Sequence, residues 1–63
     1  MEYRIRETRK SLKMSQEELA RKSNVSRTII SGLENGTITV TTTDTLSKIA
    51  MALGKKVGDI FLD

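Results

Sequence analysis

Apolar side chains recur at intervals of three and four residues along most of the chain, which is the spacing of one face of an α-helix. The β-branched run after residue 36 has no second strand to pair with, so we expect an extended loop there. The predicted fold class is therefore all-α, with one domain over residues 1–63. The five short helices expected lie at about residues 2–12, 15–24, 26–35, 43–53 and 58–62.

Residues typical of helix ends bound the two central helices. Ser15 and Glu18 have the spacing of a capping box, and Ser26 can cap the next helix with its hydroxyl. Asn24 tolerates the left-handed conformation that a tight turn needs, and Gly36 is a good helix stop. These signals predict two short helices in close succession.

The spacing also assigns an inward face to each helix. In the first helix this face holds Ile5, Thr8, Arg9 and Leu12. Arg9 is unexpected there, because a buried charge without a partner is costly. The inward positions of the later helices are Leu19, Ala20, Val25, Ile30, Leu33, Leu46, Ile49, Ala50, Leu53, Val57, Ile60 and Phe61.

The segment at about residues 15–35 has the geometry of a helix-turn-helix, with two short helices joined by a turn of three or four residues. Ala20 is small where the two helices would cross, and apolar residues close the wedge between them. The outer face of the second helix carries Arg27, Thr28, Ser31 and Gly32. Because these residues are short or form hydrogen bonds, this face is unlike a buried one.

Such a face suits the major groove of B-DNA, which admits an α-helix. Arg27 can make a bidentate contact with guanine, and Thr28 can offer its methyl or hydroxyl group to a base. Ser31 lies one turn further on, and Gly32 would let the helix approach the DNA closely. We therefore expect these four residues to read bases.

Charge and composition agree with a polyanionic partner and exclude several classes of protein. The net charge is +3, and residues 1–31 hold eight basic against four acidic side chains. Taken alone this excess is more often a solvated surface. The chain has no histidine or cysteine and no phosphate-binding glycine loop, and Glu17 and Glu18 are adjacent, so their side chains diverge. We expect no enzyme activity, no metal and no cofactor.

The apolar runs are too short to cross a bilayer, and the N-terminal residues lack the apolar core of a signal peptide. We therefore expect a cytoplasmic protein with no membrane partner.

The helix-turn-helix segment and the helices around it resemble the Cro/phage-repressor (XRE-type) helix-turn-helix family over nearly the whole chain. The resemblance implies a lambda-repressor-like fold. The sequence departs from the family pattern at Thr8 and Ser23, where apolar residues are usual, and at Lys13 and Asn24, where glycine is common. The matching positions are Ile5, Arg9, residues 15–20, Val25–Ser26, Ile30–Ser31, residues 33–36, Thr45–Leu46, Ile49–Ala50, residues 52–54 and residues 59–61.

The resemblance also implies roles for individual residues. Arg9 would pair with Glu34, which accounts for a cation on an apolar face, and the pair would be either structural or also in contact with the DNA backbone. Arg27, Thr28 and Ser31 would read bases. The phosphate-contacting residues would be Gln16, Ser26, Asn35, Arg9 and Lys10.

The leading functional hypothesis is a sequence-specific transcriptional repressor that binds a palindromic operator in double-stranded DNA as a homodimer, with the helix at residues 26–34 in the major groove. The candidates for the dimer interface are Ile38, Val40, Val57 and Phe61. The alternative role for Ile38 and Val40 is that of loop anchors in the core. Contact with RNA polymerase is a further option. The alternative is an antitoxin or phage regulatory module whose main partner is another protein.

Overall fold

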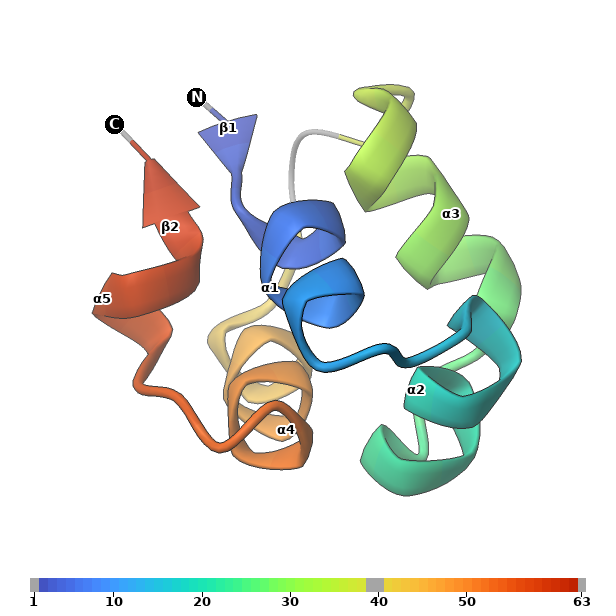
Figure 1. Cartoon of the computed structure of the whole chain (residues 1–63). Coiled ribbons are helices and arrows are strands. Elements are labelled where there is room, and N and C mark those ends of the chain that lie inside the picture. Colours follow the sequence, from blue (N-terminus) through green and yellow to red (C-terminus); the bar gives the residue numbers. More distant parts are fainter. Residues whose placement is uncertain (1, 39–40, 63) are drawn as a thin grey trace.

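Five helices follow one another along the described part of the chain, with a two-residue strand before the first and after the last (Figure 1). The computed structural model describes residues 2–38 and 41–62, with the backbone alone for residues 2, 3, 61 and 62. The all-α fold class is confirmed. The elements are β1 (Glu2–Tyr3), α1 (Ile5–Ser11), α2 (Gln16–Ser23), α3 (Arg27–Asn35), α4 (Thr43–Ala52), α5 (Val57–Ile60) and β2 (Phe61–Leu62).

The two strands join the ends of the chain, a feature that the sequence pattern did not predict. β1 and β2 pair antiparallel, with Glu2 opposite Leu62 and Tyr3 opposite Phe61. The Arg4 amide extends this pairing by donating a 2.7 Å hydrogen bond to the backbone oxygen of Ile60. The first helix was expected to start at residue 2 and the last to end at residue 62, and both of these limits were wrong. Strands of two residues are too short to show a period in the sequence.

Hydroxyl side chains begin the three middle helices. Ser15 accepts a hydrogen bond from the backbone N–H three residues further on, and Ser26 and Thr42 do the same for α3 and α4. Thr42 caps α4 one residue earlier than expected. The Glu18 carboxylate lies 3.6 Å from Lys22 Nζ, so the described contacts contain only the serine half of the expected capping box.

The turn between α1 and α2 corrects one predicted core position. Lys13 adopts a left-handed conformation, with a φ of 55°, directly after the end of α1. Leu12 precedes this turn and is 47% exposed, so its expected place on the inward face was wrong. Met14, just after the turn, is buried and joins the core instead.

The turn between α2 and α3 contains the left-handed residue that the sequence predicted. Asn24 follows α2 with a φ of 58°. Ser23, which replaces an apolar residue of the family pattern, is buried, and its hydroxyl accepts a 3.3 Å hydrogen bond from the Val25 amide. The serine thus satisfies a buried donor in the turn, where an apolar side chain would leave it unpaired.

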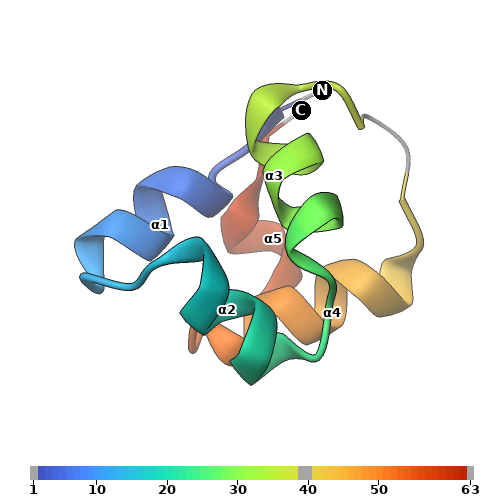
Figure 2. The ribbon, with the colours of Figure 1, turned by 90° about the vertical axis from the view of Figure 1, so that its right-hand side faces the viewer.

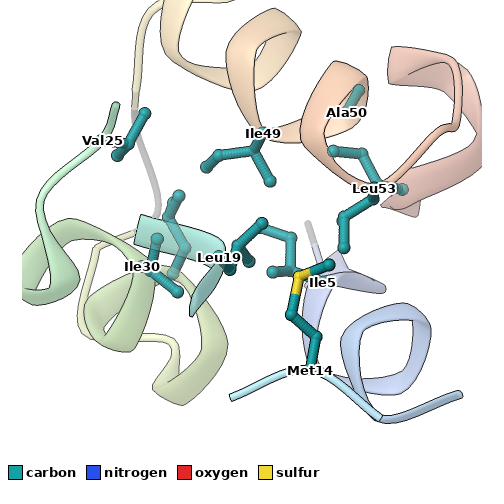
Figure 3. Packing of buried hydrophobic residues seen from close by; sticks show 10 residues of the cluster. Ile5, Met14, Leu19, Val25, Ile30, Ile49, Ala50 and Leu53 are labelled. Carbon is teal, nitrogen blue, oxygen red and sulfur yellow. The ribbon is translucent and has the colours of Figure 1, made fainter. Parts of the chain in front are cut away.

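The core lies between the helices and is apolar (Figure 3). α2 packs against α3 and α4, α1 against α3, and α5 against α4. α2 and α3 lie at one side of the molecule in Figure 1 and face the viewer in Figure 2, so one side of α3 is at the surface. Leu46 is buried as well, and the main buried cluster consists of Ile5, Met14, Leu19, Val25, Ile30, Leu33, Ile49, Ala50, Leu53 and Ile60. Within the described ranges, no helix has the length and apolar character needed to cross a membrane.

The left-handed conformation of Lys13 makes a testable prediction for stability. A residue with a side chain costs about 1–2 kcal/mol of strain in this conformation, and glycine relieves that strain. Part of this gain is lost, because glycine has more conformational entropy in the unfolded state. We expect Lys13→Gly to raise the free energy of unfolding by about 0.5–1 kcal/mol, measured by urea denaturation. The matched control is Lys10→Gly within α1, which removes the same charge and should lower it by about 1 kcal/mol. Equal effects of the two substitutions would contradict this explanation.

Candidate nucleic-acid interface

The two faces of α3 differ in burial and chemistry. Ile30 and Leu33 are buried in the core, whereas Arg27 and Thr28 are exposed and Ser31 is partly exposed. The Ser26 hydroxyl closes the first turn of the helix, and the left-handed Gly36 ends it. The apolar face thus holds α3 on the core, and the polar face is presented to solvent.

All four expected base readers line one depression in the surface. The depression has a volume of about 550 Å³ and is lined by Arg27, Thr28, Ser31 and Gly32. Arg27 Nη1 lies 3.1 Å from Glu17 Oε1 at the start of α2, and both side chains are largely exposed. Such an exposed ion pair is weak, so Arg27 can exchange Glu17 for another acceptor. The remaining lining residues are Thr37 and Ile38.

Gly32 has a packing role that the sequence pattern did not predict. It is buried, and a Cβ atom on it would lie 2.6 Å from Cγ1 of Ile38 and closer still to Cδ1. The absence of a side chain at position 32 is thus explained by the packing of Ile38 on α3. Gly32 offers no side-chain group to a base, and its place among the base readers stays a prediction.

A buried carboxylate joins three helices beside this face. The side chain of Glu34 has no exposed surface. Arg9 donates to both of its oxygens, from Nε to Oε2 at 2.8 Å and from Nη2 to Oε1 at 3.0 Å. Gln16 Nε2 and Arg6 Nε also donate to Oε1, at 3.2 and 3.3 Å. The structure therefore brings together the expected pair of Arg9 and Glu34, and it links α1, α2 and α3 through one carboxylate.

The hydrogen bonds determine the charge state of Glu34. Burial alone would raise the pKa of this carboxyl group. Hydrogen bonds from Arg9, Gln16 and Arg6, together with the positive charge of Arg9, outweigh the effect of burial and lower the pKa below its ordinary value. The hydrogen bond to Glu34 in turn raises the pKa of Arg9. The ionised pair is therefore the stable form in the folded protein at neutral pH.

Arg9 is also bound to the turn that follows its own helix. Its Nη1 donates a 2.8 Å hydrogen bond to the backbone oxygen of Met14, and the Met14 amide donates back to the Arg9 oxygen at 3.1 Å. All three nitrogens of the guanidinium thus have partners inside the protein. Of the two roles left open by the sequence, this arrangement favours the structural one.

Sequence reasoning missed Arg6, which connects this carboxylate to the outer face of α3. Its Nη2 donates a 2.8 Å hydrogen bond to Asn35 Oδ1, and Asn35 Nδ2 donates to Ser31 Oγ at 3.2 Å. A signal was present, because Arg6 precedes Arg9 by three residues and residues at that spacing share a helix face. The chain Arg6–Asn35–Ser31 positions an expected base reader.

The expected phosphate-contacting residues lie at several places around α3. Gln16 is the first residue of α2 and is half-buried beside Glu34, and Asn35 is exposed at the end of α3. Ser26 already uses its hydroxyl as the cap of α3. Lys10 is exposed on α1. Gln16 and Asn35 therefore belong to a set of hydrogen-bonded side chains that we call the Glu34 cluster, and Lys10 does not. The cluster consists of Arg6, Arg9, Gln16, Glu34 and Asn35.

The residues expected at a dimer interface are only partly described. Ile38 and Val57 are partly buried and pack against the core, which for Ile38 favours the alternative role of loop anchor. Val40 lies outside the described residues, and for Phe61 only the backbone is described. In the described part of the chain, no group of acidic side chains has the arrangement of a metal site.

The lowered pKa of Glu34 predicts a specific dependence of stability on pH. A carboxyl group whose folded pKa is below its unfolded one stabilises the fold above the unfolded pKa, and this contribution is lost as the pH falls through the folded pKa. We expect the free energy of unfolding of the wild type to fall below about pH 4.5, the ordinary value of the group. The same profile for Glu34→Gln should be flatter, with a loss of about 3–5 kcal/mol at pH 7 because Arg9 is left unpaired.

The measurement is urea denaturation between pH 3 and 7, with trimethylamine N-oxide added to keep the weakest variant folded. Glu18→Gln is the matched control, since its exposed pair with Lys22 should contribute less than about 1 kcal/mol. A Glu34→Gln profile parallel to that of the wild type would contradict the assignment.

Comparison with known proteins identifies the family of this chain. A family model described as Helix-turn-helix, of the Cro/C1 (XRE) type, matches residues 5–60 and so takes in all five helices. A search of individually characterised proteins gives no match. The match covers the capped α2 and α3, the left-handed turn between them and the Glu34 cluster beside them. The chain belongs to the Cro/C1-type (XRE) helix-turn-helix family, whose members are DNA-binding transcription regulators.

Proposed function

We propose that the chain is a repressor that binds a palindromic operator as a homodimer, with α3 in the major groove. One observation carries this proposal: Arg27, Thr28 and Ser31 are at the surface on one side of a helix whose opposite side is buried. A helix with its side chains has a diameter of about 10–12 Å, which fits a major groove about 12 Å wide. The exposed side of α3 is thus free to meet base edges.

Each exposed residue has a chemical role in this proposal. Arg27 gives up the exposed carboxylate of Glu17 and donates two hydrogen bonds to O6 and N7 of a guanine. Thr28, on the first turn of α3, offers a hydroxyl and a methyl group to the neighbouring base pair. Ser31 follows one turn later, held by Asn35. The three residues together read a short half-site.

Phosphate contacts supply the affinity and the orientation that these base contacts lack. Gln16 is at the N-terminus of α2, where free backbone N–H groups and the helix dipole favour an anion. Asn35 marks the other end of the reading face, and Lys10 adds an exposed positive charge on α1. A phosphate on either side would fix α3 in the groove.

Self-association would double a reading surface that is short by itself. Two copies related by a two-fold axis would place their α3 helices in successive major grooves, about 34 Å apart. The residues proposed for this dimer interface are Val57, Val40 and Phe61. A dimer bound across a promoter would block RNA polymerase sterically and so repress transcription.

In vitro selection from a random duplex library tests this proposal, with wild type, Arg27→Ala and Arg21→Ala in parallel. Arg21 is an exposed arginine of α2 outside the reading face, so it controls for the loss of one positive charge. We expect the wild type and Arg21→Ala to select the same inverted repeat. Arg27→Ala should lose its preference at one position in each half-site, a change of roughly 1–3 kcal/mol in binding free energy.

The other outcomes discriminate between functions. If no motif emerges and modest salt removes the bound DNA, binding is electrostatic only, and a module whose main partner is a protein becomes the better account. A single half-site in place of an inverted repeat would contradict the homodimer. A promoter reporter carrying the selected site tests the direction, since a rise in transcription would contradict repression.

A further inference from the structure

The segment after α3 packs onto the reading helix at the position where that helix has no side chain. Cγ1 and Cβ of Ile38 lie 2.6 and 3.2 Å from the place that a Cβ atom on Gly32 would occupy. Ile38 is partly buried and also packs against the core. Its side chain thus occupies the space on α3 that a side chain at position 32 would fill.

Two hydrogen bonds hold this segment against α3. The Ile38 amide donates to the backbone oxygen of Gly32 at 3.0 Å, and Thr37 Oγ1 donates to the same oxygen at 3.3 Å. Isoleucine is also branched at Cβ, which restricts rotation of its side chain. The position of Ile38 relative to α3 is therefore fixed by the fold.

Ile38 faces the same depression as the base readers. It lines the surface hollow together with Arg27, Thr28 and Ser31, and its side chain keeps part of its area exposed. Apart from the Thr28 methyl group, the base readers offer polar groups to this hollow. Ile38 therefore adds an apolar surface beside a row of hydrogen-bonding side chains.

We propose that Ile38 is a specificity-determining residue that contacts the 5-methyl group of a thymine in each half-site. This inference rests on the proposed function, because it needs α3 in the major groove. Among the groups that base pairs expose there, the thymine methyl is the apolar one, so it is the group that suits an isoleucine. Burial of one methyl group gains about fourfold in affinity.

The test replaces each thymine of the selected operator in turn by deoxyuridine, which lacks only the 5-methyl group. For the wild type we expect a loss of about fourfold in affinity at one position per half-site. Ile38→Ala should bind the thymine duplex more weakly and show no further loss at that position. Its response to deoxyuridine at every other position should match that of the wild type.

Thr28→Ala is the discriminating control, because Thr28 also carries a methyl group that can meet a thymine. Persistence of the fourfold effect in Ile38→Ala, with its disappearance in Thr28→Ala, would overturn the proposal. So would an operator in which no thymine responds. Selection of an operator without an Ile38-dependent thymine refutes this inference alone, whereas failure to select any operator refutes the proposed function itself.

Two further variants keep the test decisive if Ile38→Ala is unstable. Ile38→Val retains the apolar character and the branched Cβ, and it should reduce the response to deoxyuridine without loss of the fold, as followed by urea denaturation. Gly32→Ala places a Cβ atom where Ile38 lies and must displace that side chain. A wild-type response in both variants would overturn the proposal.

Discussion

The Glu34 carboxylate has no exposed surface, and its burial constrains the arrangement of three helices. A buried charge must be paired and its oxygens must accept hydrogen bonds, or the fold loses several kcal/mol. Arg9 supplies the opposite charge from α1, and Gln16 supplies a further donor from α2. The geometry is therefore directional: α3 has to stand where all these donors meet one side chain. Apolar contacts alone, which have no direction, would not impose this.

The same cluster reaches the surface that we assign to DNA. Arg6 bonds both to Glu34 and to Asn35, and Asn35 bonds to Ser31 on the outer face of α3. At the other end of the helix, Arg27 is exposed and paired only with the exposed Glu17 among the described contacts. Of the proposed base readers, Ser31 is thus held in place by Asn35 before DNA binds, whereas Arg27 can exchange Glu17 for a base.

The sequence was informative where local chemistry decides the structure. Hydroxyl caps, Asn24 and Gly36 predicted the ends of α2 and α3. The lone Arg9 on an apolar face indicated that it needs a partner, and the family resemblance implied that this partner is Glu34. The sequence was silent where distant segments meet. The strands that pair Tyr3 with Phe61 are too short to show an alternating pattern in the sequence. The contact between Gly32 and Ile38 depends on the path of the loop after α3. Position 32 was therefore assigned to the reading face on pattern alone, and its packing against Ile38 was not predicted.

NMR titration of the 15N-labelled protein with the selected duplex shows whether DNA binds the outer face of α3 while the Glu34 cluster stays intact. If α3 binds the duplex, we expect the largest amide shifts at Arg27, Thr28, Ser31 and Gln16, with the Nε–H resonance of Arg9 retained. Shifts that gather on α4 around Lys48 and Met51, with α3 unchanged, would contradict binding through α3.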